Sequence, residues 1–254
     1  MNNIYFTRWP DNLSDVAVTG TDIRYLEDGK VYFSNETFSP GKVLCTWRSK
    51  TNYIEQGIKP TLPLLESGQK YKLTAQLESD NGLSVQLQII FYDINQEKID
   101  GIILKGLSDK FTYPDDAVSY EISLLNLNNK WLKFDYLEIN NVKDKRIVTA
   151  HLGKHGSFIF TTPAINGAVG KRLGITFSRG PSTITEVPEL IDKSVLGGII
   201  HVYTDGNNLK ELLNEIKNKF EFKNLSVLEH QKNCFYHLTD SEIKQIKYFL
   251  SKNN

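Results

Sequence analysis

The first half of the chain alternates apolar and polar residues with a period of two, and this pattern constrains the fold more than any other feature. The run 83–93 is the clearest case, because Leu, Val, Leu, Ile and Phe recur there at every second position. The runs 71–77, 118–124 and 131–139 alternate similarly, and Asp28-Gly29 marks a hairpin turn. Successive side chains of a strand point to opposite faces, and no helical repeat interrupts these runs. The first half is therefore predicted to be an antiparallel β-sandwich.

Two details of these strands carry further predictions. The apolar residues slip phase between Phe134 and Leu137, which predicts a bulge near Asp135. One sheet is also expected to present a polar face, made of Gln86, Gln88 and Tyr92 beside Thr74 and Gln76. Such a face suits a polyhydroxylated ligand, and the alternative is an ordinary solvated surface.

Beyond residue 146 the pattern changes to strands that alternate with helices. The charged stretch 143–146 is interpreted as a linker between two domains, 1–142 and 147–254. One helix is expected over 209–220, and a second is expected to begin at a capping box formed by Thr239 and Glu242. A third, shorter helix is expected near Thr185, where Pro188 would lie in the first turn. Strands are expected at 172–178, 198–205, 224–229 and 234–238. This order predicts a small α/β domain.

Composition narrows the class of protein. The chain has 254 residues, 40% of them hydrophobic and 24% charged, which is ordinary for one large or two average globular domains. Cys45 and Cys234 lack the spacing of a disulfide framework or a metal site, as is typical of a reducing compartment. No signal peptide and no membrane-length apolar run is recognisable, so we expect a cytoplasmic protein without direct membrane insertion.

The charge is divided unevenly along the chain. Residues 1–142 carry 14 Lys and Arg against 19 Asp and Glu, whereas residues 143–254 carry 16 against 11. A nucleic-acid-binding protein would cluster its positive charge more strongly and interleave it with aromatic residues. We therefore expect no nucleic-acid partner, and two domains that attract each other or meet different partners.

We find no constellation of residues that would form an active site. The stretch 167–172 lacks the first glycine and the Ser or Thr of a phosphate-binding loop, and 177–182 is no hydrolase nucleophile turn. Five histidines and the pair Asp115-Asp116 also lack partners at ligand or acid–base spacing: His151, His155, His201, His230 and His237. We expect His151 and His155 in loops and the other three on strands. The sequence predicts no catalysis, no cofactor and no metal.

A loop with aromatic and polar residues is the best candidate for a binding site. Trp47, Arg48, Asn52 and Tyr53 precede a segment stiffened by prolines and then a strand. Aromatic rings can stack on the C–H faces of sugars while Asn and Arg hydrogen-bond the hydroxyls. The alternative is that Trp47 and Tyr53 are core aromatic residues of the sandwich.

Several ordered motifs in the first 140 or so residues resemble the smallest of the three accessory secretory proteins of the accessory Sec system of Gram-positive bacteria. The motifs are Trp47-x-Ser49-x-Thr51-Asn52-Tyr53, Pro60-x-Leu62-Pro63-Leu64-Leu65-x-x-Gly68-x-x-Tyr71-x-Leu73, Ile89-x-Phe91-Tyr92-Asp93, Phe111-x-Tyr113-Pro114-x-x-Ala117-x-Ser119-Tyr120 and Leu132-x-Phe134. The resemblance covers residues 1–142 and leaves the α/β half outside it.

This resemblance implies a carbohydrate-binding-module-like sandwich without catalytic activity, which acts in the cytoplasm. It implies as partners two sister accessory secretory proteins, an accessory SecA motor, and a serine-rich adhesin that carries O-linked N-acetylglucosamine. Trp47, Asn52 and Tyr53 occupy the matching motif and are the expected glycan contacts, and Arg48 is added from the chemistry of the loop.

Three functions remain open from the sequence. The first is a binding module that helps to deliver glycosylated adhesin to the translocation motor. The second is a subunit of a carbohydrate-active enzyme, whose sandwich presents glycosylated substrate to a C-terminal domain resembling a transferase or esterase. The third is a sandwich that mediates protein contacts only.

Overall fold

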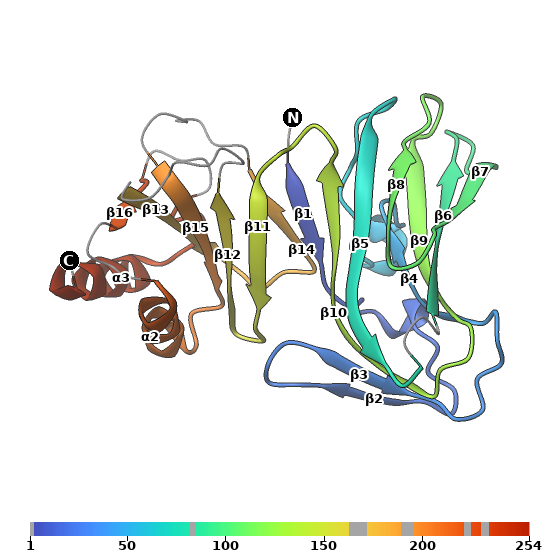
Figure 1. Cartoon of the computed structure of the whole chain (residues 1–254), viewed down its shortest axis with the longest axis horizontal. Helices are drawn as coiled ribbons and strands as arrows, with labels where there is room; N and C mark the ends of the chain where they lie inside the picture. The colour runs from blue at the N-terminus through green and yellow to red at the C-terminus, as the bar shows by residue number, and fades with distance from the viewer. Residues whose placement is uncertain are drawn as a thin grey trace.

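Two antiparallel sheets, built from the first half of the chain and one strand of the second half, face each other (Figure 1). The structure, a computed structural model, describes residues 3–81, 85–162, 172–188, 196–220, 225–229 and 234–253. One sheet has the order β4-β9-β6-β7, with bounds Val43–Arg48, Ser119–Asn126, Val85–Tyr92 and Lys98–Ile103. The other sheet contains β1 Ile4–Thr7, β2 Asp22–Tyr25, β3 Val31–Ser34, β5 Lys70–Ser79, β8 Ser108–Thr112, β10 Trp131–Asn141 and β14 Ile184–Val187.

The apolar face of each sheet is buried against the other. Leu87, Ile89 and Phe91 of β6 are fully buried, as their alternation predicts, and they belong to one cluster with Leu73 and Phe134 of the opposite sheet. Each such side chain contributes about 1.5–3 kcal/mol when it leaves water. The predicted β-sandwich is confirmed.

Strand β10 changes its partner half-way along its length. On one edge it pairs with β5 throughout, while on the other edge it pairs first with β3 and then with β1. The register shifts between Phe134 and Tyr136, which confirms the bulge predicted near Asp135. This edge of the sheet therefore divides into a fork, with β3 and β2 on one branch and β1 and β14 on the other.

The second half of the chain forms a mixed sheet with two helices on one face (Figure 1). Its order is β11-β12-β15-β13-β16, with bounds Ile147–Leu152, Gly156–Thr162, Leu196–Thr204, Arg172–Arg179 and Leu225–Val227. Strand β13 is parallel to both of its neighbours, and the other pairs are antiparallel. The helices are α2, Leu209–Lys219, and α3, Asp240–Asn253.

The predicted capping box opens α3. The backbone N–H of Thr239 donates to Glu242 Oε2, and the backbone N–H of Glu242 donates in turn to Thr239 Oγ1.

The other face of the mixed sheet lies against the outer face of the sandwich. Ile4 and Phe6 of β1 and Val187 of β14 form a small buried cluster there with Leu152 and Ile159.

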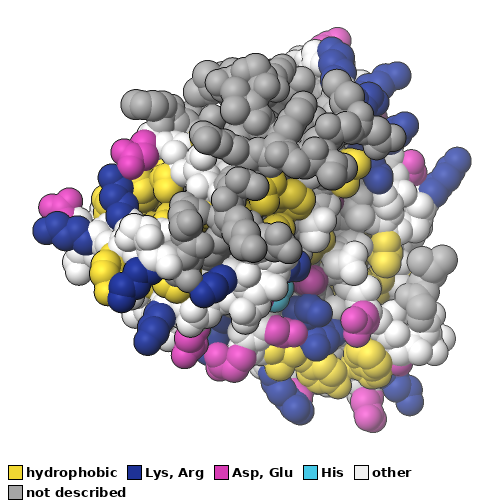
Figure 2. Space-filling view, turned by 60° about the vertical axis from the view of Figure 1, so that its left-hand side comes forward, with side chains coloured by type: hydrophobic (Ala, Val, Ile, Leu, Met, Phe, Trp, Pro, Cys, Tyr) yellow, Lys and Arg dark blue, Asp and Glu magenta, His cyan; other side chains and the backbone are white. Residues whose placement is uncertain are grey.

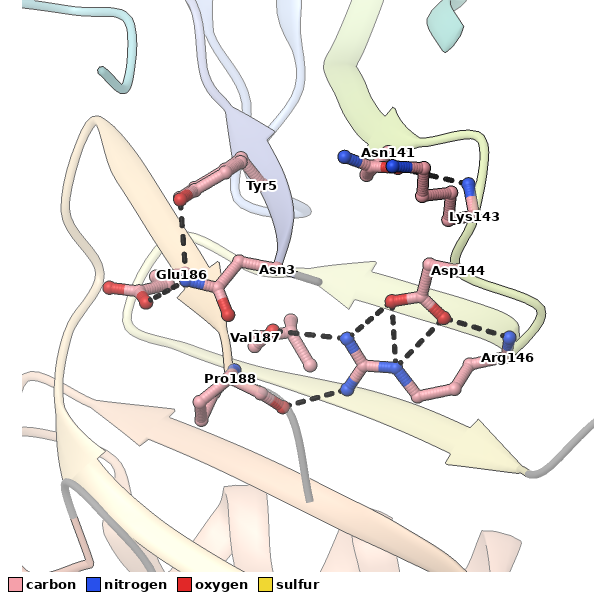
Figure 3. Close-up of polar contacts among 9 residues, drawn as sticks. All are labelled: Asn3, Tyr5, Asn141, Lys143, Asp144, Arg146, Glu186, Val187 and Pro188. Atoms are coloured by element: carbon pink, nitrogen blue, oxygen red, sulfur yellow. Dashed lines mark hydrogen bonds and ion pairs between the residues drawn. The ribbon is translucent and has the colours of Figure 1, made fainter. Parts of the chain in front are cut away.

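A buried ion pair fixes the segment between the two halves (Figure 3). The Arg146 guanidinium binds the Asp144 carboxylate with Nη2 to Oδ2 at 2.7 Å, and it also donates to the carbonyl of Pro188 at 2.7 Å. The two side chains are 10% and 3% exposed. The stretch 143–146, predicted to be a linker, is thus anchored to the end of β14.

Three predictions about the fold were wrong, and two strands were missed. The segment at Thr185 is strand β14, because Ile184–Val187 pairs with β1 instead of turning into a helix. Residues 234–238 form turns, since Phe235 and His237 have positive φ angles and only Tyr236 bridges to Ser178. The expected joint polar face is divided between two sheets, because β5 and β6 lie in different ones. Finally, β11 and β12 were not foreseen.

Surface charge on the second half is mixed. On the face shown in Figure 2, basic and acidic side chains are interspersed below the residues drawn in grey. Within the described part of the chain, no helix is long and apolar enough to cross a membrane.

Cys45 and Cys234 are both free thiols. Burial raises the pKa of Cys45 well above its ordinary value, with a smaller effect from Asp15.

Candidate functional site

The four residues predicted to bind glycan lie at the end of β4 and in the segment that follows it. Trp47 and Arg48 are the last residues of β4, Asn52 precedes a short helix, and Tyr53 begins that helix, α1 Tyr53–Gln56. The segment was expected to be one loop. The structure instead divides it between a strand, a connection and a helical turn.

Trp47 belongs to the core of the sandwich. Its side chain is 0% exposed, its ring lies 5.3 Å from Phe134 and 6.1 Å from Trp9 between centroids, and its Nε1 donates to the Arg8 carbonyl at 2.7 Å. No face of the ring is open to solvent, so Trp47 cannot be the stacking surface that we expected. The core alternative is the correct one for this residue.

Arg48 is held by two carboxylates from distant segments. Its Nε donates to Asp15 Oδ1 at 2.9 Å, and its Nη1 forms an ion pair with Glu121 Oε1. Asp15 lies in the short 3-10 helix η1, Leu13–Asp15, and Glu121 lies on β9. The Tyr92 hydroxyl donates to the second oxygen of Glu121 at 3.0 Å. This network orients the guanidinium at the rim of the sandwich.

The network forms one wall of a cleft of about 350 Å³, which we call the Arg48 cleft. It is lined by Ser14, Asp15, Arg48, Lys50, Thr51, Asn52, Ile58 and Glu121. Sequence reasoning had found Arg48 and Asn52, and the structure brings these two together. Tyr53 follows Asn52 directly and is 58% exposed.

The groups that line the Arg48 cleft can form hydrogen bonds with a neutral polar ligand. It offers a guanidinium, an ammonium, an amide and hydroxyl groups beside two carboxylates, so donors and acceptors are both present. Asp15 Oδ2 is buried and has no hydrogen-bond partner among the described residues. An unpaired buried carboxylate oxygen is costly, and a donor supplied by a ligand or a water would satisfy it.

Sequence reasoning missed Asp15 and Glu121. Each lies in its own segment, more than 30 and 70 positions from Arg48 respectively, and only the antiparallel pairing of β4 with β9 brings Glu121 opposite Arg48. The one local signal was a carboxylate on the polar side of a predicted strand, which is common on solvated faces.

The histidines considered in the sequence as possible metal ligands or catalytic groups lie in different parts of the fold. His151 lies on β11 rather than in a loop, with Nε2 at 3.2 Å from Glu215 Oε1, while His155 Nδ1 lies 2.8 Å from Asp205 Oδ2. His201 is buried on β15, and burial lowers its pKa to about 3, with a smaller effect from Arg146. Within the described residues no three His, Cys, Asp or Glu side chains are grouped to hold a metal. His230 and residues 167–171 lie outside the described residues.

The fold and the Arg48 cleft together define the class: a two-sheet β-sandwich protein with a polar cleft at the end of its sheets and an attached mixed sheet. The family described as "Accessory Sec secretory system ASP3" matches residues 17–141. The accessory Sec system protein ASP3 of Streptococcus gordonii is 31% identical over 126 residues, which are 50% of this chain and 79% of that protein. The chain belongs to this family.

Further relatives extend the comparison. The ASP3 protein of Staphylococcus aureus is 32% identical over 141 residues, which cover 56% of this chain and 44% of that protein. A chain in the crystal structure of accessory secretory proteins 1, 2 and 3 of Streptococcus pneumoniae is 28% identical, with a TM-score of 0.51 over 54% of this chain and 95% of that chain.

A solved structure also resembles the second half in fold. A chain of the Glycosylation Associate Protein (Gap123) complex of Streptococcus agalactiae has a TM-score of 0.53 and is 20% identical, over 98% of this chain and 88% of that chain. The fold likeness therefore extends over both halves.

Proposed function

We propose that this chain is a non-catalytic component of an accessory Sec export system. In this role it binds an O-glycosylated serine-rich adhesin and sister accessory proteins in the cytoplasm, and it helps to deliver the adhesin to an accessory SecA motor. The observation that carries the proposal is the family match over the sandwich, with 31% identity to the Streptococcus gordonii protein across 79% of its length.

The glycan contacts that we propose are Arg48, Asn52 and Tyr53. Arg48 and Asn52 line one cleft, and the exposed Tyr53 ring next to it can stack on a sugar such as N-acetylglucosamine. The buried Trp47 does not contact the sugar in this proposal. Its packing in the core fixes the end of β4, and thereby the position of Arg48, the last residue of that strand. In this proposal the sandwich acts as a carbohydrate-binding module.

Each sugar contact in such a cleft is weak. Stacking and a few hydrogen bonds exchanged with water leave little net free energy for one ring. A serine-rich adhesin carries many sugars on one chain, so binding at one site raises the effective concentration of the next sugar. We therefore expect millimolar affinity for a free sugar and a much higher affinity for a multiply glycosylated peptide.

Sister accessory proteins are the second class of partner. Support comes from the solved relatives, which belong to complexes of accessory secretory proteins 1, 2 and 3 and to the Gap123 complex. Large apolar side chains also stand exposed on the segments that follow β4 and β6, namely Ile54, Leu64 and Ile94. The centres of protein interfaces are more apolar than the rest of the surface, so these three side chains are our candidate contact residues. The mixed sheet and its helices would add a further docking surface.

Binding of a glycosylated serine-rich peptide to the full chain tests the glycan part of the proposal. Two tyrosines give matched variants, because Tyr53 is 58% and Tyr248 is 60% exposed, and only Tyr53 directly follows a residue that lines the Arg48 cleft, Asn52. Tyr53→Ala and Asn52→Ala should weaken binding measured by calorimetry, whereas Tyr248→Ala should leave it unchanged. Absence of binding by the unaltered chain would refute the glycan claim.

Co-purification with the sister proteins tests the assembly part. If Asn52→Ala abolishes peptide binding but the sister proteins still co-purify, the two functions use separate surfaces. If the sister proteins co-purify and no glycopeptide binds, the chain mediates protein contacts only. Release of sugar or a changed glycan after incubation, seen by mass spectrometry, would favour the carbohydrate-active enzyme instead.

A further inference from the structure

A second cavity lies in the fork of the seven-stranded sheet. Strand β1 ends and β3 begins at the point where β10 changes partner, so none of the described strands pairs with this edge of β10 at Asp135. A cavity of about 220 Å³ lies between the two branches of the fork, bounded by Arg8 and Trp9 after β1 and by the hairpin of β2 and β3. We call it the fork pocket. It shares no lining residue with the Arg48 cleft.

The second half of the chain closes the fork pocket. The turn between β11 and β12 contributes Lys154, and the segment before β14 contributes Thr183, whose carbonyl accepts from the backbone N–H of Arg8 at 2.9 Å. The tip of the hairpin packs tightly against that turn, because a Cβ atom at Gly29 would lie only 2.0 Å from the Leu152 carbonyl oxygen. The pocket therefore exists only where both halves meet.

The lining combines aromatic rings with both donors and acceptors. Tyr25 is 51% exposed and presents part of its ring and its hydroxyl, while Trp9 is 2% exposed and its Nε1 has no hydrogen-bond partner among the described residues. The Asp11 carboxylate accepts from the Thr183 hydroxyl at 3.0 Å and retains free acceptor positions. Lys154 Nζ, which pairs with Glu27 at 2.8 Å, adds a donor at the rim.

These features select a small neutral ring with several hydroxyl or amide groups. The volume is below the range of about 300–1,000 Å³ found for sites of drug-sized ligands, so a single ring fits and an oligosaccharide does not. An apolar ring face would lie on Tyr25, and hydroxyls would meet Asp11, Thr183 and Lys154. A strongly charged ligand is disfavoured because cationic and anionic groups line the same pocket.

We infer that the fork pocket binds a single sugar residue, as a second glycan site distinct from the Arg48 cleft. The choice of a sugar over other small polar rings rests on the proposed glycan function. A chain with two such sites can engage two sugars of one glycosylated segment at once, which raises affinity without any new contact.

Titration of the full chain with N-acetylglucosamine, followed by amide NMR shifts, tests this inference. In the unaltered chain, the backbone amides of the hairpin 25–31 and of Ser182 and Thr183 should shift and saturate. Tyr25→Ala should raise the Kd obtained from these shifts roughly tenfold, in line with the loss of one aromatic contact. Tyr248→Ala removes a similarly exposed tyrosine that lines neither site, so it is the matched control and should leave the shifts unchanged. Asp11→Asn, which keeps the hairpin intact, serves if Tyr25→Ala loses its fold.

The outcomes separate the two proposals. Shifts confined to residues of the Arg48 cleft, and insensitive to Tyr25→Ala and Asp11→Asn, would overturn the fork pocket and leave the proposed function standing. Shifts at the hairpin that survive both variants would also overturn it. If neither site responds at millimolar sugar, and the glycosylated peptide does not bind either, both proposals fail.

Discussion

Replacement of Arg146 by methionine should destabilise the chain more than any surface substitution. The guanidinium contacts both oxygens of Asp144 and the carbonyls of Pro188 and Val187, at distances from 2.7 to 3.5 Å. Its side chain is 10% exposed and that of Asp144 is 3% exposed. Methionine retains much of the apolar stem but leaves the carboxylate buried without its counter-charge.

The expected loss follows from this uncompensated charge. Removal of one member of a buried ion pair costs about 3–5 kcal/mol of unfolding free energy, mostly because the remaining charge has lost its water. The double variant Asp144→Asn and Arg146→Met removes both charges, so it should lose less than Arg146→Met alone. The neighbouring Lys145 is exposed, and Lys145→Met is the matched control with an effect within about 0.5 kcal/mol.

Urea denaturation followed by circular dichroism measures these differences. Amide hydrogen exchange adds a local readout, because the Arg146 guanidinium holds the end of β14 through the carbonyls of Val187 and Pro188. Arg146→Met should therefore speed exchange in Ile184–Val187. If Arg146→Met and Lys145→Met shift the transition equally, the reasoning about the buried pair is refuted.

Three further predictions concern the core, a buried base and a helix cap. Trp47→Ala should cost about 3–5 kcal/mol and Tyr53→Ala less than about 0.5 kcal/mol in thermal denaturation, because only Trp47 is buried; equal losses would contradict this. His201 stays neutral in the fold while the unfolded chain protonates near pH 6.5, so stability should fall by about 2 kcal/mol between pH 7 and 5. His201→Gln should flatten that slope, as urea midpoints at each pH would reveal. Thr239→Ala should cost about 1 kcal/mol by loss of the α3 cap, and an unchanged melting temperature would argue against the capping box.

The sandwich strands with one solvated face were predictable from the sequence. In β6 every second residue is buried, which is the signal that strict alternation provides. Strand β4 gave no such signal, because four successive residues from Leu44 to Trp47 are buried and the run reads as neither period. That is the physical reason why Trp47 resembled part of a loop.

Short strands with distant partners were not predictable. Strand β14 has four residues, and its partner β1 lies more than 170 positions away in the sequence. A single proline next to it supported a helix, and the long-range pairing decided otherwise. The site shows the same limit, since Arg48 and Asn52 were visible locally whereas Asp15 and Glu121 join them only through the tertiary fold.

The pairing of β14 with β1 has a practical consequence for dividing this protein. A fragment that ends at residue 142 would lose β14 and the mixed sheet together, and it would leave an unpaired strand edge at Ile4–Thr7. The apolar side chains of Ile4 and Phe6, now covered, would face water beside that edge. An open edge next to apolar surface is a template for self-association. The isolated sandwich should therefore dimerise or aggregate, and sugar-binding measurements belong on the intact chain.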